Sequence, residues 1–293
     1  MPFTSSLIYR ALVPKPVRTN ILLNSLRKKI PQFLSSSSHA SDPELQEVSK
    51  HILEHGVSIF PYPFADGYTA DRIDVFKDEA NGLRYVLMEG KRLYFKRRWS
   101  EARIRRSFRD LSMEQDGQSP HRYLSPDFEV ESDDVVADFG AAEGNFSLSV
   151  VDRVSKIYLF ECDPEWIEAL EHTFAPWRDK VEIVPRFVSD KDDDRHCSGD
   201  NYFQDRPVSF LKIDVDGGER QLLRGFDKIL QQQRKMKIAL CTYHQHEDEH
   251  EFTEKLQAIG FDVNPSPGYM VFYYDKKLRP PYLRRALVRA VKR

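Results

Sequence analysis

The chain has 293 residues and a formal net charge of −2, and 40% of its residues are apolar. This composition can bury a sizeable core and excludes wholesale disorder. The charge is uneven: residues 1–41 and 276–293 hold 14 basic residues and no acid, so the middle has 44 − 14 = 30 basic against 46 acidic residues. An acidic body is not typical of a nucleic-acid-binding fold, and we expect no nucleic-acid partner.

Cysteine usage and hydropathy indicate the compartment. The three cysteines, at positions 162, 197 and 241, lack C-x-x-C spacing, so the sequence predicts neither a zinc site nor a disulfide framework. No apolar run reaches the ~18 residues that span a bilayer, and Arg10 interrupts the N-terminal apolar stretch before a secretory signal forms. We therefore expect a cytoplasmic protein, with peripheral contact at the inner face of the membrane as an option for its basic ends.

The N-terminal arm, residues 1–41, is basic and ends in a serine-rich linker at 35–38. Within it, Leu22, Leu26 and Ile30 fall on one side of a short helix predicted over about 19–29. After the linker, Ser41 or Asp42 can cap a helix that begins at Pro43 and runs to about residue 54.

The accessory region, residues 42–118, continues with a small β-meander. Asn-Gly at 81–82 and Glu-Gly at 89–90 separate strand-like runs at 83–88 and 91–96. A helix capped by Ser100 is predicted over about 101–115. A dense arginine cluster accompanies it, at positions 97, 98, 103, 105, 106 and 109. This cluster is either a solvated helix face or a surface for an acidic or phosphorylated substrate.

From 119 to 275, predicted strands and helices alternate, which favours a mostly parallel sheet with right-handed crossovers. Strands are predicted at 135–138, 156–161, 181–184, 208–213, 237–242, 261–263 and 270–274, and helices at 145–152, 165–174, 219–231 and 249–259. The short Pro-Gly turn at 265–268 permits an antiparallel pair of strands at the sheet edge.

The first strand leads into Asp138-x-Gly140-x-Ala142-x-Gly144 and then a helix start. Glycines let the backbone approach a ligand, and the helix amides face it. The dinucleotide fingerprint G-x-G-x-x-G is absent. This loop resembles that of class I S-adenosylmethionine (SAM) methyltransferases, where a carboxylate suits the cationic groups of SAM. A glycine turn that serves only packing is the alternative.

Glu161 ends the second strand, 23 residues after Asp138. An acid near ~20 residues past such a loop typically accepts the ribose hydroxyls of a nucleoside. Val188 to Asp190 follow the third strand, where residues commonly flank the adenine. The predicted cofactor-binding residues are Asp138, Gly140, Ala141, Ala142, Gly144, Asn145, Phe146, Glu161, Cys162, Ser189 and Asp190.

A longer motif points to one family. Lys212-Ile-Asp214-Val-Asp216-Gly-Gly218-Glu219, followed by Leu-x-Gly at 223–225, resembles the K-x-D-x-E-G-x-E…L-x-G signature of FkbM-type SAM methyltransferases. The resemblance covers about residues 120–275. Asp216 stands where the family has Glu, and Gly218 where it has Ala, which puts a direct role of residue 216 in doubt.

The resemblance implies a class I (Rossmann-like) seven-stranded sheet, mostly parallel with an antiparallel edge strand, and SAM as cofactor. It further implies methyl transfer to an oxygen, often a hydroxyl of a sugar, glycan or related metabolite. Asp214, at the end of the fourth strand, is the first candidate for contact with the acceptor, and His244 is the second candidate base. His244 also has a structural alternative, as a hydrogen-bonded histidine, and so does Glu219, as a helix-start acid.

A metal is not expected. His246 and His250 are four apart in an acid-rich stretch, as a metal pair on a helix would be, but their surroundings indicate an exposed helix start. A metal-assisted mechanism that uses Asp214 and Asp216 stays open. Residues 276–293 are predicted to form a basic amphipathic helix, which either lies on an anionic membrane or packs on the body.

Two rival functions stay open. A scaffold or interaction protein could keep the fold without catalysis, since fold alone does not establish function. An NAD-dependent oxidoreductase is the enzymatic rival, disfavoured by the missing fingerprint.

Overall fold

The computed structural model describes residues 15–36 and 40–293, and these form two compact units. The first unit runs to Asp66 and also includes Gly268–Arg284, whereas the second comprises Gly67–Pro267 and Arg285–Arg293. The predicted accessory region is thereby divided between the units after residue 66. Residues 1–14 of the predicted basic arm and 37–38 of its linker lie outside the described residues.

The first unit is built on two helices, α2 (Lys15–Ser36) and α3 (Pro43–His55), followed by the short 3-10 helix η2 (Pro63–Gly67). The predicted start of α3 is confirmed, because the Asp42 carboxylate accepts from the amide of Glu44 at 2.9 Å. Apolar side chains of both helices form one buried cluster, which includes Leu26, Ile30, Leu34, Leu45, Val48 and Ile52. Helix α2 is longer than predicted and contains Pro31.

The second unit begins with 3-10 helix η3 (Ala70–Arg72) and the predicted meander. The meander is a three-stranded antiparallel sheet of β1 (Phe76–Lys77), β2 (Arg84–Met88) and β3 (Lys91–Tyr94). Helix α4 (Glu101–Glu114) follows, and Ser100 Oγ accepts from the amide of Arg103, as its capping role predicts.

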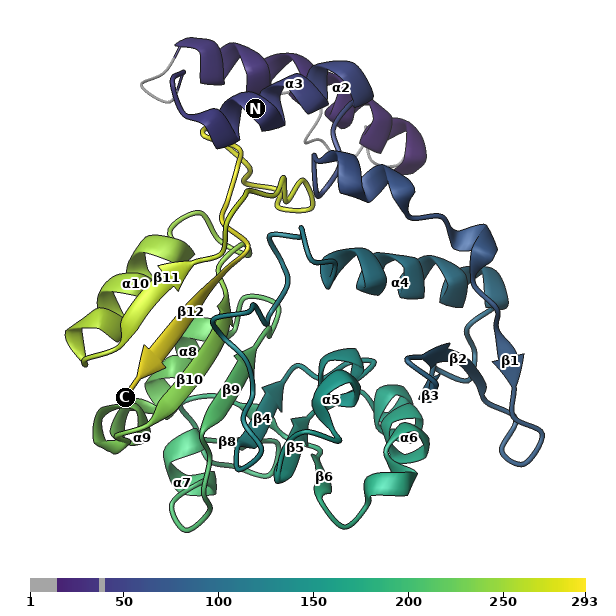
Figure 1. Cartoon of the computed structure of the whole chain (residues 1–293), viewed down its shortest axis with the longest axis vertical. Coiled ribbons are helices and arrows are strands. Elements are labelled where there is room, and N and C mark those ends of the chain that lie inside the picture. Colours follow the sequence, from purple (N-terminus) through teal and green to yellow (C-terminus); the bar gives the residue numbers. More distant parts are fainter. Residues whose placement is uncertain (1–14, 37–39) are drawn as a thin grey trace. The chain divides into compact units, whose positions relative to one another are not determined.

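The main sheet has seven strands in the order β11-β12-β10-β9-β4-β5-β6, which confirms the predicted fold class (Figure 1). These strands are β4 (Val135–Phe139), β5 (Lys156–Phe160), β6 (Val181–Val184), β9 (Phe210–Ile213), β10 (Met236–Cys241), β11 (Asp262–Pro265) and β12 (Leu287–Lys292). Strand β12 is antiparallel to both of its neighbours and stands second from the edge. A parallel two-stranded sheet of β7 (Phe187–Val188) and β8 (His196–Cys197) is separate.

Helices cover both faces of the main sheet, because successive residues of its strands alternate between two apolar clusters. On one face lie α5 (Asn145–Val150), α6 (Pro164–Thr173) and the 3-10 helix η4 (Ala175–Trp177), with the meander and α4. On the other lie α7 (Gly199–Tyr202), α8 (Glu219–Gly225), α9 (Asp227–Gln232) and α10 (Asp248–Ala258). The helix predicted over 219–231 is therefore two helices, separated at Phe226.

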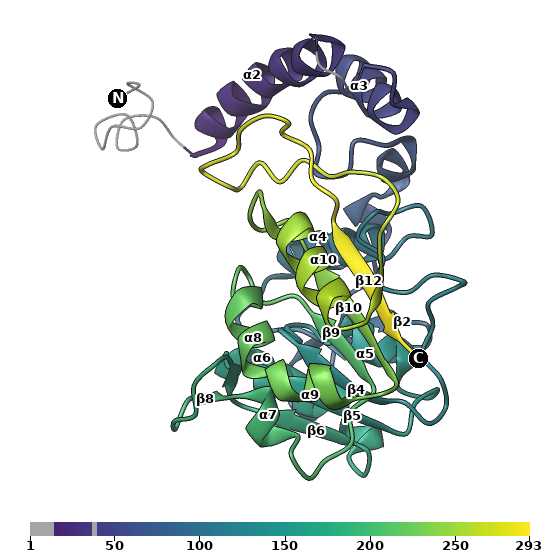
Figure 2. The same ribbon diagram turned by 90° about the vertical axis from the view of Figure 1, so that its left-hand side faces the viewer.

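The predicted C-terminal amphipathic helix is wrong, because residues 287–292 form strand β12. Six residues of β12 pair with β10, and four also pair with β11. Figure 2 shows β12 alongside β10. Leu287, Val288 and Ala290 are buried between layers, so their spacing reflects a strand covered on both faces rather than a helix stripe. Membrane contact was one of two alternatives for this segment, and it depended on the amphipathic helix that the structure does not contain.

The strand predicted at 270–274 is also wrong, because these residues do not belong to the main sheet. Its place in the sheet belongs to β12, and Met270 makes only an isolated bridge with Arg284. Among the described residues, no helix combines the length and the apolarity that crossing a membrane requires.

Candidate active site

The glycine loop after β4 lies against the ends of β5 and β9. Gly140 has a φ of +72°, and a Cβ there would meet the carbonyl oxygen of Asp214 at 1.9 Å. The amides of Gly140 and Ala141 both donate to the carbonyl of Phe160 at 3.2 Å. Only glycine fits at position 140, because both the dihedral and the close approach exclude a side chain.

A cavity of about 440 Å³ opens at this edge of the sheet. Its volume falls within the roughly 300–1,000 Å³ of small-molecule sites. It lies at the carboxyl ends of β4, β5 and β9, where doubly wound sheets bind ligands. Its wall includes the predicted site residues Gly140, Ala142, Glu161, Cys162 and Asp214.

Glu161 organises one side of the cavity. Its Oε1 accepts from the amides of Cys162 at 2.7 Å and Asp163 at 2.8 Å, and its Oε2 accepts from the amide of Ala142 at 2.9 Å. Three backbone donors therefore fix the carboxylate between the glycine loop and the end of β5. The structure places this acid where the sequence predicts a ribose-binding residue.

Asp138 lies inside the protein rather than on the cavity wall. Its side chain is 1% exposed, and its Oδ1 is 2.9 Å from the Nζ of Lys212. Ser147 Oγ donates to Oδ2 at 2.7 Å. The loop carboxylate thus already has a cationic partner, so its predicted contact with a cationic ligand is corrected to a buried ion pair.

Lys212, the lysine of the family signature, also secures the loop. Its ammonium donates to the carbonyl of Gly140 at 2.8 Å. Parallel pairing of β4 with β9 aligns Asp138 directly with Lys212, which explains how two charged residues on buried strands find each other.

Four other predicted cofactor residues lie away from this cavity. Asp190 is paired with Arg224 at 2.7 Å, and the carbonyl of Ser189 lies against Gly225. Asn145 and Phe146 line a separate cavity of about 550 Å³, which α4 also borders. That larger cavity lacks the glycine loop and the strand ends, so the smaller one is the better candidate for chemistry.

Ala141 and Gly144 serve the fold of the loop. Ala141 is buried in the core. A Cβ at Gly144 would lie 2.6 Å from Leu170, so glycine allows the loop to pack on α6.

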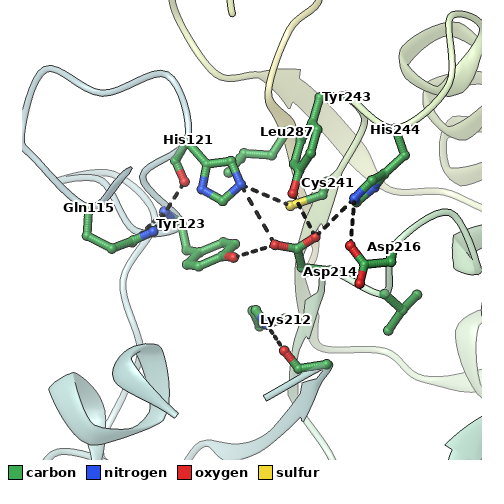
Figure 3. A network of polar contacts seen from close by, with 12 residues as sticks. Gln115, His121, Tyr123, Lys212, Asp214, Asp216, Cys241, Tyr243, His244 and Leu287 are labelled. Carbon is green, nitrogen blue, oxygen red and sulfur yellow. Dashed lines mark hydrogen bonds and ion pairs between the residues drawn. The ribbon is translucent and has the colours of Figure 1, made fainter. Parts of the chain in front are cut away.

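Asp214 is the centre of a polar network that joins two segments to β9 (Figure 3). Tyr123 donates its hydroxyl to Oδ2 at 2.9 Å, and Tyr243 donates to Oδ1 at 3.1 Å. His121 Nε2 lies 3.8 Å from Oδ2, and His244 Nε2 lies 3.6 Å from Oδ1. Both carboxylate oxygens therefore face aromatic donors.

Charge around Asp214 keeps it ionised. Burial opposes ionisation, but the positive charges of Lys212 and His244 outweigh it and lower the pKa of Asp214. Burial, together with the charge of Asp214, raises the pKa values of Tyr123 and Tyr243 well above the ordinary 10.0. At neutral pH the site therefore holds one carboxylate and two neutral phenols.

The two histidines have opposite charge states. Burial lowers the pKa of His121 to about 4, so it is neutral at pH 7. Burial would do the same to His244, but hydrogen bonds to Asp216 and Glu219 reverse the effect and raise its pKa to about 10. His244 Nδ1 lies 3.0 Å from Glu219. As an imidazolium at neutral pH, His244 is not a base in this arrangement.

Two further acids have raised pKa values, which favours their neutral forms. Burial and the charge of Asp214 raise the pKa of Glu114 to about 8. Burial also raises the pKa of Glu143, whose Oε1 accepts from Ser107 Oγ at 3.0 Å. Of these three acids, Asp214 is therefore the one whose ionised form is favoured, and its charge suits a cationic ligand.

Two sets of potential metal ligands share Asp214: one adds His121 and Cys241, and the other adds Glu219 and His244. Each set has its ligand atoms within 4.8 Å of one another. Within residues 15–36 and 40–293, the pair His246 and His250 belongs to no such set. His250 instead lies 3.4 Å from Glu254 on the exposed side of α10.

The arginine cluster is a solvated, ion-paired surface. Arg97 pairs with Glu168 and Arg98 with Glu165. Arg103 stacks over Trp99 at 4.1 Å from the ring centroid. These contacts favour the surface alternative over a substrate-binding one.

Sequence reasoning missed Lys212, His121, Tyr123 and Tyr243. His121 and Tyr123 precede β4, in a segment that has neither a periodic pattern nor a motif. Tyr243, however, lies beside the predicted His244 at the end of β10. The register of Asp138 against Lys212 was also a usable signal, since both charges sit in apolar strands.

Part of this region is similar to a protein-family model. Residues 194–263 match the model of the methyltransferase FkbM domain. The match contains Asp214, Glu219 and His244 but begins after the glycine loop, so it does not include that loop. No curated protein matches the chain.

Solved structures are similar at low identity. A methyltransferase FkbM from Methylobacillus flagellatus KT is 12% identical over 65% of this chain, with a TM-score of 0.45, and this chain covers 54% of its length. A precorrin-6y C5,15-methyltransferase from Geobacter metallireducens GS-15 is 14% identical over 56% of this chain and 84% of its own, with a TM-score of 0.38. A Streptococcus mutans protein in complex with SAH is 12% identical over 56% of this chain and 91% of its own, with a TM-score of 0.40.

Proposed function

We propose that this chain transfers a methyl group from SAM to a hydroxyl oxygen of a sugar, glycan or related metabolite. The match of residues 194–263 to the methyltransferase FkbM domain supports this proposal. The observation that carries the proposal is the Glu161 carboxylate, held by three amides on the wall of the cavity at the strand ends. An acid at this position suits the ribose hydroxyls of a nucleoside cofactor.

The residues on the wall fit SAM. Glu161 would accept from the ribose hydroxyls, and the backbone at Gly140 and Ala142 allows close approach because no large side chain projects there. The charges of Asp214 and Asp216, which line the same cavity, suit a sulfonium. When bound, SAM supplies an electrophilic methyl group.

Asp214 would contact the acceptor. As an ionised carboxylate, it can accept the hydrogen bond of an acceptor hydroxyl and orient a lone pair of its oxygen. Tyr123 and Tyr243 hold the carboxylate in place with their single hydroxyl protons, and each phenol oxygen can accept a hydrogen bond from a second hydroxyl of the acceptor. The imidazolium of His244 helps to keep Asp214 anionic rather than removing the proton itself.

Calorimetry with S-adenosylhomocysteine tests the cofactor. We expect wild-type protein to bind it, and Glu161→Gln to weaken binding roughly 10–100-fold, because hydrogen bonds to a charged group contribute about 1.5–3 kcal/mol. Glu182→Gln is the matched control: this acid lies on the adjacent β6, 3.2 Å from Lys156, and does not line the cavity. Asp214→Asn should still bind.

NAD serves as the competing ligand in the same titration. Binding of NAD alone would overturn the assignment, and binding of neither ligand would favour the scaffold role.

The acceptor class is tested by transfer of tritiated methyl groups. Glycosides with free hydroxyls should be labelled and matched amino sugars should gain no label on nitrogen, whereas Asp214→Asn should abolish labelling. Exclusive labelling of nitrogen would refute the hydroxyl acceptor.

We also propose a cytoplasmic location, which the three free cysteines support.

A further inference from the structure

A second cluster of titratable groups lies in the first unit, at the end of α3. His51 and His55 are four residues apart and therefore lie on the same helix face. Their rings stack with centroids 4.5 Å apart and an interplanar angle of 7°. The Asp66 carboxylate, from η2, lies 3.3 Å from Nδ1 of His55. Two imidazoles and one carboxylate thus converge from two segments.

The spacing of these groups suits a metal ion. One ligand atom from each of the three residues lies within 4.8 Å of the others. Zinc bonds of about 2.0–2.2 Å at tetrahedral angles separate ligand atoms by roughly 3.4 Å. Side-chain rotations at His55 and Asp66 can close the remaining gap, because both side chains are about half exposed (51% and 53%).

The helix places the two histidines on one face before any ion binds, and burial restrains the side chain of His51. His51 is 6% exposed, and its neighbours Val48 and Ile52 are fully buried in the core of the unit. Arg27, from α2, donates to the carbonyls of Leu53 and Glu54 and so secures the last turn of α3. A site on a rigid helix loses little entropy on binding.

The chemistry of the set favours a transition metal. Imidazole nitrogens are common ligands of such metals, which they bind in the neutral form. Glu54 lies 3.9 Å from Nε2 of His55 and adds negative charge. Two nitrogen ligands and one oxygen ligand suit Zn²⁺ better than Mg²⁺ or Ca²⁺, which prefer oxygen alone.

We propose that His51, His55 and Asp66 bind one Zn²⁺ ion, which joins the end of α3 to η2 and leaves one coordination position for water or an external ligand. The site is separate from the sets around Asp214 and does not depend on the proposed methyl transfer. Its direct consequence is structural, because the ion closes the chain between residues 55 and 66 and stabilises the folded first unit.

Titration of the full chain tests the site. Protein freed of metal with a chelator is titrated with ZnCl₂ by calorimetry, and with CoCl₂ to record the visible absorption of tetrahedral Co²⁺. We expect binding of one ion at this site. His55→Gln and Asp66→Asn should each weaken that binding by at least about tenfold. Both side chains are half exposed, so circular dichroism should confirm that these variants fold.

Two controls separate this site from others. His250→Gln removes an exposed histidine that faces an acid, Glu254, on α10, and should leave binding unchanged. Asp214→Asn disables both ligand sets of the cavity and should also leave the ion bound at α3. Zn²⁺ should raise the melting temperature of the wild type more than that of Asp66→Asn.

Three results would overturn the proposal: no Zn²⁺ binding by the wild type, unchanged binding in both His55→Gln and Asp66→Asn, or binding that only Asp214→Asn removes. The third result would move the ion to the cavity of the second unit.

Discussion

Replacement of Lys212 by Met should destabilise the second unit severely. The ammonium of Lys212 is the cationic partner of Asp138, and their side chains are 5% and 1% exposed. Methionine preserves most of the volume but removes the charge, so it leaves a buried carboxylate with Ser147 as its remaining side-chain donor. The carbonyl of Gly140 also loses its ammonium donor.

The expected loss is about 3–5 kcal/mol of unfolding free energy, the usual cost of breaking a buried ion pair by removing one partner. Asp138→Asn in the same background should recover part of this loss, because no buried charge is then left uncompensated. The double variant should therefore be more stable than the sum of the single effects predicts, with a coupling energy of about 2 kcal/mol or more. Lys156→Met is the control: its pair with Glu182 is partly exposed, and its loss should cost less than about 1 kcal/mol.

Urea unfolding followed by tryptophan fluorescence measures these differences. The three tryptophans, Trp99, Trp166 and Trp177, all lie in the second unit, so their emission reports on its unfolding. A loss of unfolding free energy below about 1 kcal/mol in Lys212→Met would refute this reasoning. Strictly additive effects in the double variant would also refute it, because they would show that Lys212 and Asp138 do not form an energetically coupled pair shielded from water.

His244 should make stability depend on pH. Its folded pKa is raised from 6.5 to about 10, so its contribution is complete below pH 6.5 and disappears as the pH rises through 10. Urea unfolding from pH 6 to 10.5 should show a decline that His244→Gln lacks; parallel curves would show that His244 is not an imidazolium in the fold. Deletion of residues 287–293 should abolish cooperative unfolding of the second unit, because β10 and β11 lose their shared partner. A deletion variant with wild-type circular dichroism and unfolding would contradict the placement of β12.

The sequence by itself determined the features that depend on neighbours along the chain. Asp42 and Ser100 were identifiable as helix caps because a cap contacts amides two or three residues away. Gly140 and Glu161 were identifiable because a strand, a glycine turn and an acid at the next strand end recur with fixed spacing in doubly wound sheets. The prediction of the sheet and the resemblance to a family both depended on the order of strands, helices and short motifs along the chain.

Tertiary structure alone decided the partners of the charged and aromatic groups. Tyr123 reaches Asp214 across 91 positions of sequence, so no local pattern connects them. Asp138 was assigned to a ligand because its own segment cannot show that β9 brings Lys212 beside it.

The C-terminal strand shows the same limit most clearly. The apolar residues of 283–291 fit the stripe of an amphipathic helix as well as they fit a buried strand. The pattern alone therefore does not distinguish the two, and the neighbouring elements decide between them. Strand β12 exists because β10 and β11 leave a place between them that its amides and carbonyls fill. Because both faces of β12 are buried, its sequence lacks the alternation of apolar and polar residues that marks a half-exposed strand. Its partners β10 and β11 are set by the fold and cannot be identified from the segment itself.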